Sequence, residues 1–282
     1  MDVSIILIYG LLLFSVISIW VRLKLFNKIP LWMFLLASSF VLAIIFEKAS
    51  FISLGYTLLF GLSVYYFYQT KNIWLFFVVL ALSIPLFIHL PILGFNNYRY
   101  LHNITLTASS TPYSLYFNLD KTLVGVCIIG FSFDYKKIEL RPILKLLAIN
   151  LVLMILVFFV LAITLGYSKF DPKLPYFTPA WILANLFFTC MAEEALFRKL
   201  LQQRIADFSK GKYTAAISIS VASALFGLVH YKGGVVYIIS AALAGIFYGY
   251  MYHKSKRIEG AILLHFTFNL THFLLFTYPA LK

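Results

Sequence analysis

Long apolar runs separated by short polar connections dominate the chain. A helix of about 20 apolar residues crosses a bilayer, whereas the strands of a membrane barrel are segments of roughly ten alternating residues. The runs are far longer than such strands, so the pattern predicts an all-α, polytopic membrane protein of about eight to ten transmembrane helices. The candidate helices are residues 3–21, 31–46, 51–68, 73–93, 121–133, 143–166, 179–200, 213–230, 234–252 and 259–276.

The composition supports this class of protein. Hydrophobic residues make up 62% of the chain, the mean hydropathy is +0.92, and charged residues make up only 12%. A soluble chain keeps about a quarter of its residues charged. The run at 121–133 is short for a hydrocarbon layer about 30 Å thick, so we expect this helix to be tilted or only partly inserted.

The net charge of +13 does not indicate a nucleic-acid partner, because most basic residues lie in the short connections. That distribution is typical of the positive-inside rule and of anionic lipid headgroups. One alternate set of connections carries 15 Lys and Arg, and the opposite set with the tail carries seven. We expect the set with 15 basic residues to be cytoplasmic and both termini to lie outside. This set comprises the connections 22–30, 69–72, 134–142 with Lys145, 199–212 and 253–258.

The longest polar segment, residues 94–120, divides the chain. The four predicted spans before it carry no embedded acid or base apart from His89 near a span end, where we expect an interfacial role. The start of the chain lacks the basic region of a cleaved signal, so 3–21 is expected to remain as the first span. Cys127 and Cys190 fall inside apolar runs and are interpreted as small buried hydrophobes, not as a disulfide or a thiolate metal site.

Two adjacent acids, Glu193 and Glu194, lie inside an apolar run and are followed by Arg198. An unpaired carboxylate at membrane depth costs about 2.5 to 3.5 kcal/mol on insertion scales, so these groups need partners. Residues four apart share a helix face, which lets Arg198 pair with Glu194. One alternative is a buried ion-pair cluster that fixes helix packing. However, one carboxylate suffices for one arginine, which leaves Glu193 to face something else.

Two further polar clusters follow at helical spacing. Phe226 and His230 are four apart near the end of the run 213–230, and His265 and Asn269 are four apart inside the last run. Taken alone, a histidine at the position of His230 is typical of an interfacial residue. Taken alone, the pair His265 and Asn269 could simply form hydrogen bonds between helices.

Depth favours a common site for these clusters. The connections 205–212 and 253–258 fall on the same predicted side. At a rise of about 1.5 Å per residue, the four side chains lie roughly 11 to 25 Å from that side, in a band across the middle of the bilayer. Three helices that aim polar groups at one layer predict a shared, water-filled pocket lined by Glu193, His230, His265 and Asn269.

The ordered set Glu-Glu-x-x-x-Arg, Phe-x-x-x-His and His-x-x-x-Asn resembles the CAAX protease and bacteriocin-processing family of intramembrane glutamic endopeptidases, which includes the Ras-converting CAAX proteases. The resemblance covers about residues 176–276, and residues 117–125 resemble a lead-in seen in bacterial members. It implies a protease domain at 117–282, preceded by membrane helices of unassigned role at 1–116. It also implies an integral, multi-pass protein of a prokaryotic cell membrane.

The same resemblance implies roles for the site residues. Glu193 would be the general base for a water, His230 would hold that water, and His265 with Asn269 would stabilise the oxyanion. Glu194 and Arg198 would support the base. The implied partner is a peptide or protein substrate at the membrane, such as a CAAX-type tail or a peptide precursor, with no cofactor and no nucleic acid; the oligomeric state stays open.

Three alternatives compete with this interpretation. One carboxylate and two histidines could bind zinc, although the sequence has no His-Glu-x-x-His and the resemblance favours a metal-free site. A catalytically silent membrane scaffold or bacteriocin-immunity-type binding protein would keep the same fold. A transporter would use the acids and histidines as a proton path, but it leaves the motif order unexplained.

Overall fold

A computed structural model describes residues 2–21, 23–26, 28–133, 139–166, 168–209 and 211–282. Parts of the predicted cytoplasmic connections 22–30, 134–142 and 199–212 lie outside these residues. Within them the chain is overwhelmingly helical, which confirms the expected all-α polytopic membrane protein. The chain forms two compact units: unit 1 is Met1–Tyr100, Tyr116–Lys137 and Phe187–Ala192, and unit 2 is Leu101–Leu115, Ile138–Leu186 and Glu193–Lys282.

Membrane crossing is supported by helix length and hydropathy. Among the described residues, five helices are long and apolar enough to cross a bilayer: Phe51–Thr70, Leu140–Ala162, Thr178–Phe208, Tyr231–Ser255 and Ile258–Leu275. Shorter apolar helices are Val3–Ser18, Leu31–Ile45, Ile73–Phe87 and Thr214–Leu228. Large apolar side chains such as Leu156 and Val160 are exposed on the Leu140–Ala162 helix, as expected of a surface that faces lipid instead of water.

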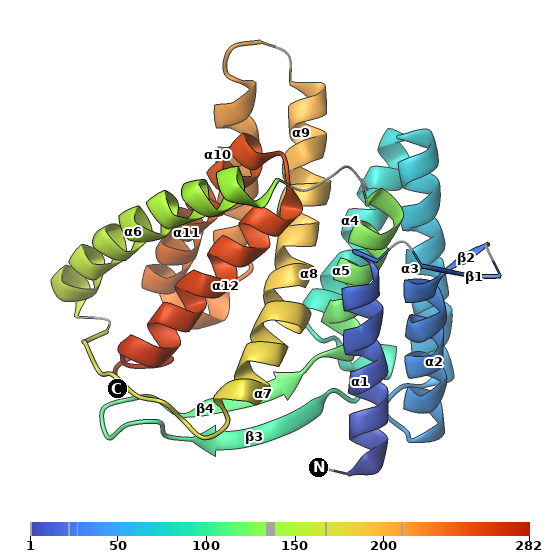
Figure 1. The fold of residues 1–282 in the computed structure, drawn as a ribbon, viewed down its shortest axis with the longest axis horizontal. Helices are drawn as coiled ribbons and strands as arrows, with labels where there is room; N and C mark the ends of the chain where they lie inside the picture. The colour runs from blue at the N-terminus through green and yellow to red at the C-terminus, as the bar shows by residue number, and fades with distance from the viewer. Residues whose placement is uncertain (1, 22, 27, 134–138, 167, 210) are drawn as a thin grey trace. The chain divides into compact units, whose positions relative to one another are not determined.

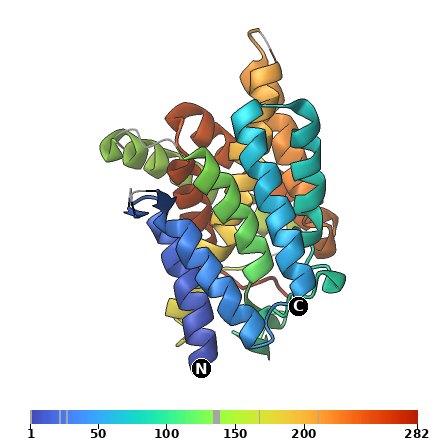
Figure 2. The ribbon, with the colours of Figure 1, turned by 90° about the vertical axis from the view of Figure 1, so that its right-hand side faces the viewer.

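Unit 1 is a bundle in which α1 packs against α2, α3 packs against α4, and α5 contacts α1, α3 and α4 (Figure 2). Its main helices are α1 (Val3–Ser18), α2 (Leu31–Ile45), α3 (Phe51–Thr70), α4 (Ile73–Phe87) and α5 (Leu119–Ser132). Short elements between them are β1 (Lys24–Leu25), β2 (Ile29–Pro30) and the 3-10 turn η1 (Pro91–Leu93).

Helix α5 corresponds to the short apolar run at 121–133. Every residue from Thr122 to Ile129 is buried. Apolar side chains on all sides are required when a helix is surrounded by other helices, and this requirement does not depend on spanning length. The run is therefore apolar because protein encloses it.

Gly125 of α5 is a point of close approach within unit 1. A Cβ at this position would lie 2.8 Å from Ala192 Cα and would also meet the side chain of Met191. We expect Gly125→Ala to lower stability by about 1 to 3 kcal/mol, because the backbone atom cannot give way. Thermal unfolding in detergent measures this. Gly55→Ala on α3 is the control, since its Cβ would meet nothing within 4 Å, and equal melting temperatures for the two variants would contradict the prediction.

The polar segment 94–120 contains a feature that helix-based analysis did not predict. Strands β3 (Tyr98–Ile104) and β4 (Tyr113–Phe117) form a two-stranded sheet. The loop between them is held by Ser110, whose hydroxyl oxygen accepts the backbone N–H of Leu106 and of Thr107, both at 3.2 Å. The segment is thus ordered structure and not a flexible linker.

His89 does more than the interfacial role expected for it. Its Nδ1 lies 2.9 Å from Asp120 Oδ2 of α5, and the aspartate is buried. Asn97 stabilises the start of the same helix, because its Oδ1 accepts the Leu119 N–H at 2.7 Å. All of these residues belong to unit 1.

Unit 2 contains the helices that carry the three motifs (Figure 1). They are α6 (Leu140–Leu165), the continuous stretch α7 (Thr178–Leu183), η2 (Ala184–Cys190), α8 (Met191–Glu194), η3 (Ala195–Gln202) and α9 (Gln203–Phe208), then α10 (Thr214–Leu228), the 3-10 turn η4 (Tyr231–Gly233), α11 (Gly234–Ser255) and α12 (Ile258–Leu275). Within the continuous stretch, residues Phe187–Ala192 belong to unit 1. Helix α11 packs against α10, α12 and α6. Small residues permit the α10–α11 approach, since a Cβ on Gly227 would lie 2.6 Å from the Ile238 carbonyl oxygen.

Candidate active site

The two acids lie in a helix of unusual geometry. The π-helical segments η2 and η3 flank the four α-helical residues of α8, which end at Glu194. Single π turns inside α-helices are frequent at functional sites. Glu193 is only 5% exposed and Glu194 is completely buried. Both carboxylates therefore need compensation from within the protein.

Both carboxylate oxygens of Glu194 are engaged. Arg198 Nε donates to Oε2 at 2.9 Å, which is the pairing that the four-residue spacing predicts. Oε1 lies 2.8 Å from Nδ1 of His265 on α12. Hydrogen bonds to an ionised group are roughly twice as strong as neutral ones. Glu194 thus joins its own helix to α12, a tertiary contact that the sequence analysis did not assign to it.

His265 lies between the two acids. Its other ring nitrogen, Nε2, is 3.8 Å from Glu193 Oε2, which is longer than a direct hydrogen bond. The ring is only 4% exposed and stacks on Tyr248 of α11, with centroids 4.4 Å apart and planes at 15°. The stack and the Glu194 bond together fix the plane of the imidazole.

Arg198 is fully buried and uses an aromatic cage in addition to its carboxylate partner. Its guanidinium carbon lies 5.2 Å from the Phe226 ring centroid and 5.9 Å from that of Tyr248. A cation over an aromatic face gains about 2 kcal/mol when it is desolvated. Neither Nη atom has a hydrogen-bond partner among the described residues. The ion pair and the rings are therefore what hold this charge.

His230 lies two residues after the end of α10, directly before the turn η4. Its Nδ1 lies 2.7 Å from the Phe226 carbonyl oxygen, and its ring lies 4.8 Å from that of Phe226. The Phe226 ring is also 5.8 Å from the His265 ring, so one phenylalanine borders both histidines. This contact gives the phenylalanine of Phe-x-x-x-His a physical purpose. The approach of His230 to Glu193 remains a prediction.

Asn269 contacts a residue that the sequence analysis missed. Its Nδ2 donates to Oδ1 of Asn185, on η2, at 3.3 Å. The signal was available, because Asn185 is an amide inside an apolar run, and polar residues in membrane helices are seldom without a partner or role. It belonged to no motif, and it was overlooked for that reason.

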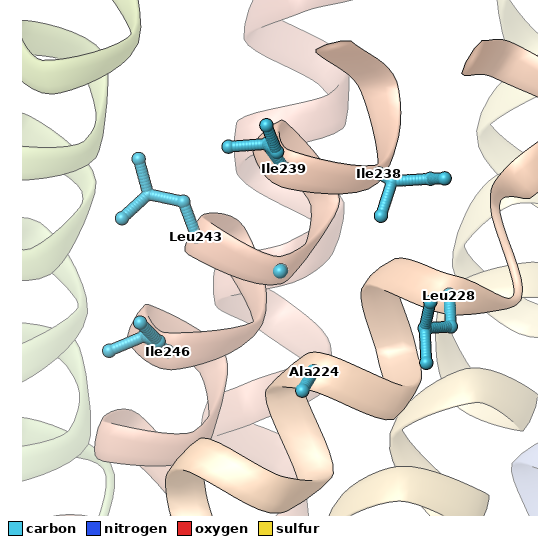
Figure 3. Close-up of a pocket in the computed structure, with 7 residues that line it drawn as sticks. Ala224, Leu228, Ile238, Ile239, Leu243 and Ile246 are labelled. Carbon is cyan, nitrogen blue, oxygen red and sulfur yellow. The ribbon is translucent and has the colours of Figure 1, made fainter. Parts of the chain in front are cut away.

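A groove lies between α10 and α11 (Figure 3). Its volume is about 470 Å³, and its lining is entirely aliphatic. Leu228, which lines it from α10, precedes His230 by two residues. The lining residues are Ala224, Leu228, Ile238, Ile239, Ala242, Leu243 and Ile246.

The described residues contain no group of three or more His, Cys, Asp and Glu side chains placed to hold a metal ion. His265, one candidate zinc ligand, has Nδ1 directed at Glu194. The expectation of a metal-free site remains a prediction for chelation experiments.

Comparison with known proteins tests the family resemblance. No curated protein and no solved structure matches the chain. A family model described as type II CAAX prenyl endopeptidase Rce1-like matches residues 175–271. That range contains Glu193, Glu194, Arg198, His230, His265 and Asn269. The resemblance drawn from the three motifs is therefore confirmed, and residues 175–271 carry the sequence pattern of the Rce1-like CAAX endopeptidase family.

Proposed function

We propose that this protein is an intramembrane endopeptidase that hydrolyses a peptide bond with a water activated by Glu193. The family match supports a membrane protease. The observation that carries the mechanism is the position of His265 between the two acids. Glu194 uses both oxygens in bonds of 2.9 and 2.8 Å, whereas Glu193 lies 3.8 Å from the nearest His265 nitrogen. We therefore assign Glu194 to support the site and Glu193, beside the ring of His265, to take the proton from water.

The proposed reaction conserves atoms and protons. Glu193 takes one proton from water while the water oxygen attacks the carbonyl carbon of the scissile bond. The carbonyl oxygen becomes an oxyanion, and it re-forms the carbonyl when the C–N bond breaks. The proton held by Glu193 passes to the leaving nitrogen. General-base assistance of this kind contributes about 10²- to 10⁴-fold to the rate.

His265 and Asn269 stabilise the oxyanion in this proposal. Because an ionised carboxylate only accepts, Nδ1 of His265 carries a hydrogen toward Glu194. To donate to the oxyanion as well, the ring must also carry a hydrogen on Nε2, the nitrogen on the side of Glu193. A donor to an oxyanion is worth about 3 to 4 kcal/mol.

His230 holds the attacking water in this proposal. A backbone carbonyl only accepts, so Nδ1 of His230 carries the hydrogen of its 2.7 Å bond to Phe226. In the neutral ring, Nε2 is then an acceptor. An acceptor on one side and the Glu193 carboxylate on the other would fix both hydrogens of a water.

The substrate class follows from the family and the groove. The family description names a CAAX prenyl endopeptidase, and the groove between α10 and α11 is aliphatic throughout. We infer a membrane-associated protein or peptide whose apolar part lies against α10 and α11. A CAAX-type tail and a peptide precursor both satisfy this description. The cleavage test is incubation of a membrane-anchored peptide with the protein in vesicles made with ¹⁸O-labelled water. Incorporation of one ¹⁸O into the new carboxylate would support hydrolysis, and intact peptide would contradict the proposal.

Filling the groove should weaken substrate binding. Each methylene displaced from apolar contact is worth about 0.8 kcal/mol, so Ala224→Phe should raise KM roughly tenfold with little change in kcat. The measurement is steady-state cleavage of the anchored peptide. Ala216→Phe is the matched control, because Ala216 is an exposed alanine on the same helix outside the groove lining. Equal KM values for the two variants would show that the groove does not bind the substrate.

A further inference from the structure

We propose that Asn185 is a positioning residue that sets the orientation of the Asn269 amide. This inference rests on the proposed function, in which Asn269 donates to the oxyanion. Asn269 Nδ2 gives one hydrogen to Asn185 Oδ1 across a sequence separation of 84 residues. A terminal amide rotates between two broad and nearly equivalent positions. An acceptor fixed on another helix selects one of them.

The consequence for Asn269 follows from its hydrogen-bonding capacity. Its amide has two N–H donors and one oxygen acceptor. With one N–H directed at Asn185 Oδ1, a flip of the Asn269 amide alone would place oxygen against oxygen. The flipped form would present its carbonyl oxygen where the proposed mechanism needs a donor. Asn185 therefore acts through Asn269 and does not itself need to contact the substrate.

The contact lies in register with the rest of the helix interface. Three residues of α12 at four-residue spacing each contact the Thr178–Phe208 helix. Phe273 stacks on Trp181 with centroids 4.2 Å apart, Asn269 bonds to Asn185, and His265 bonds to Glu194. Asn269 is thus midway between an aromatic anchor and the acid cluster. A rotation of either helix that broke the amide contact would also disturb its two neighbours.

The π-helical geometry explains how Asn185 reaches this interface. In a regular α-helix, eight residues turn roughly 80° beyond two full turns, so Asn185 and Glu193 would face different directions. A π turn holds more residues than an α turn, which reduces that offset. Residues Ala184–Cys190 are π-helical and cover most of the interval. The wide turns therefore bring the amide and the acid toward one face of the helix.

A double-mutant cycle in kcat tests the proposal. Asn185→Leu keeps the side-chain size and removes the acceptor, and we expect kcat to fall about tenfold or more while KM stays near the wild-type value. In an Asn269→Ala background the same substitution should have no further effect on kcat. A purely structural role would instead lower the melting temperature in both backgrounds and leave kcat of the folded fraction unchanged. Multiplicative effects in the cycle, or an unchanged kcat, would overturn the inference.

Two controls keep the result decisive. Asn150 is a buried asparagine in a membrane helix, and its Nδ2 donates to the Leu146 carbonyl of its own helix at 2.8 Å. Asn150→Leu should keep kcat, and a loss equal to that of Asn185→Leu would count against a specific role. If Asn185→Leu does not fold, Asn185→Ala also removes the acceptor and supplies the same cycle. Glu193→Gln measured alongside separates the two ideas, because its full activity would end the proposed function regardless of how Asn185 behaves.

Discussion

Glu193→Gln should abolish cleavage of a membrane-anchored peptide while the protein stays folded. An amide has the size of the carboxylate but does not take a proton from water, so the rate should fall by about 10²- to 10⁴-fold. The neighbouring contacts of Glu194 with Arg198 and His265 do not involve the substituted side chain. The melting temperature in detergent should therefore remain close to that of the wild type. Single-turnover cleavage measured by mass spectrometry gives the rate of the chemical step.

Glu259→Gln is the matched control for this experiment. Glu259 is a glutamate of the same unit, mostly buried, and it pairs with Arg257 at 3.1 Å near the start of α12. Its amide should retain the wild-type rate. Undiminished cleavage by Glu193→Gln would remove Glu193 from the mechanism. A cellular phenotype that persists in this variant would favour the scaffold alternative.

The fold was largely predictable because bilayer physics constrains it. Apolar runs such as 143–166 and 234–252 correspond to α6 and α11, since backbone groups in lipid must satisfy one another within a helix. Hydropathy does not distinguish a helix surrounded by protein from one surrounded by lipid. For that reason the burial of α5 needed a structure. The β3–β4 hairpin was missed because its polar residues were taken as a divider between helices.

The site was predictable as far as local spacing reaches. A separation of four residues suffices to pair Glu194 with Arg198, and the structure has that bond. The bond of Glu194 with His265 spans 71 residues and depends on how two helices are rotated against each other. The π turns on both sides of α8 change that rotation, and no pattern of apolar positions reveals them. Asn185 could have been noticed as an amide inside an apolar run, but its partner Asn269 also depends on that rotation.

Arg198→Met should cause the largest loss of stability among single substitutions at the site. The arginine is completely buried, and its removal leaves the equally buried Glu194 carboxylate with His265 as its remaining partner. Breaking a buried ion pair by removing one partner destabilises by about 3 to 5 kcal/mol. The contacts of the guanidinium with Phe226 and Tyr248 are lost as well. Thermal or denaturant unfolding in detergent micelles measures the effect.

A second substitution separates the charge from the packing. Adding Glu194→Gln to Arg198→Met removes the uncompensated carboxylate, while the amide oxygen still accepts from His265 Nδ1. The double variant should therefore regain part of the lost stability, although it has one more change from the wild type. Arg257→Met is the control, because Arg257 and Glu259 keep 16% and 15% of their side chains exposed and water can replace the pair. We expect a smaller loss there. Two results would contradict this argument: an Arg198→Met variant that unfolds at the wild-type temperature, or a double variant less stable than Arg198→Met. In either case the buried pair of Glu194 and Arg198 does not stabilise the helix, and another contact must orient His265.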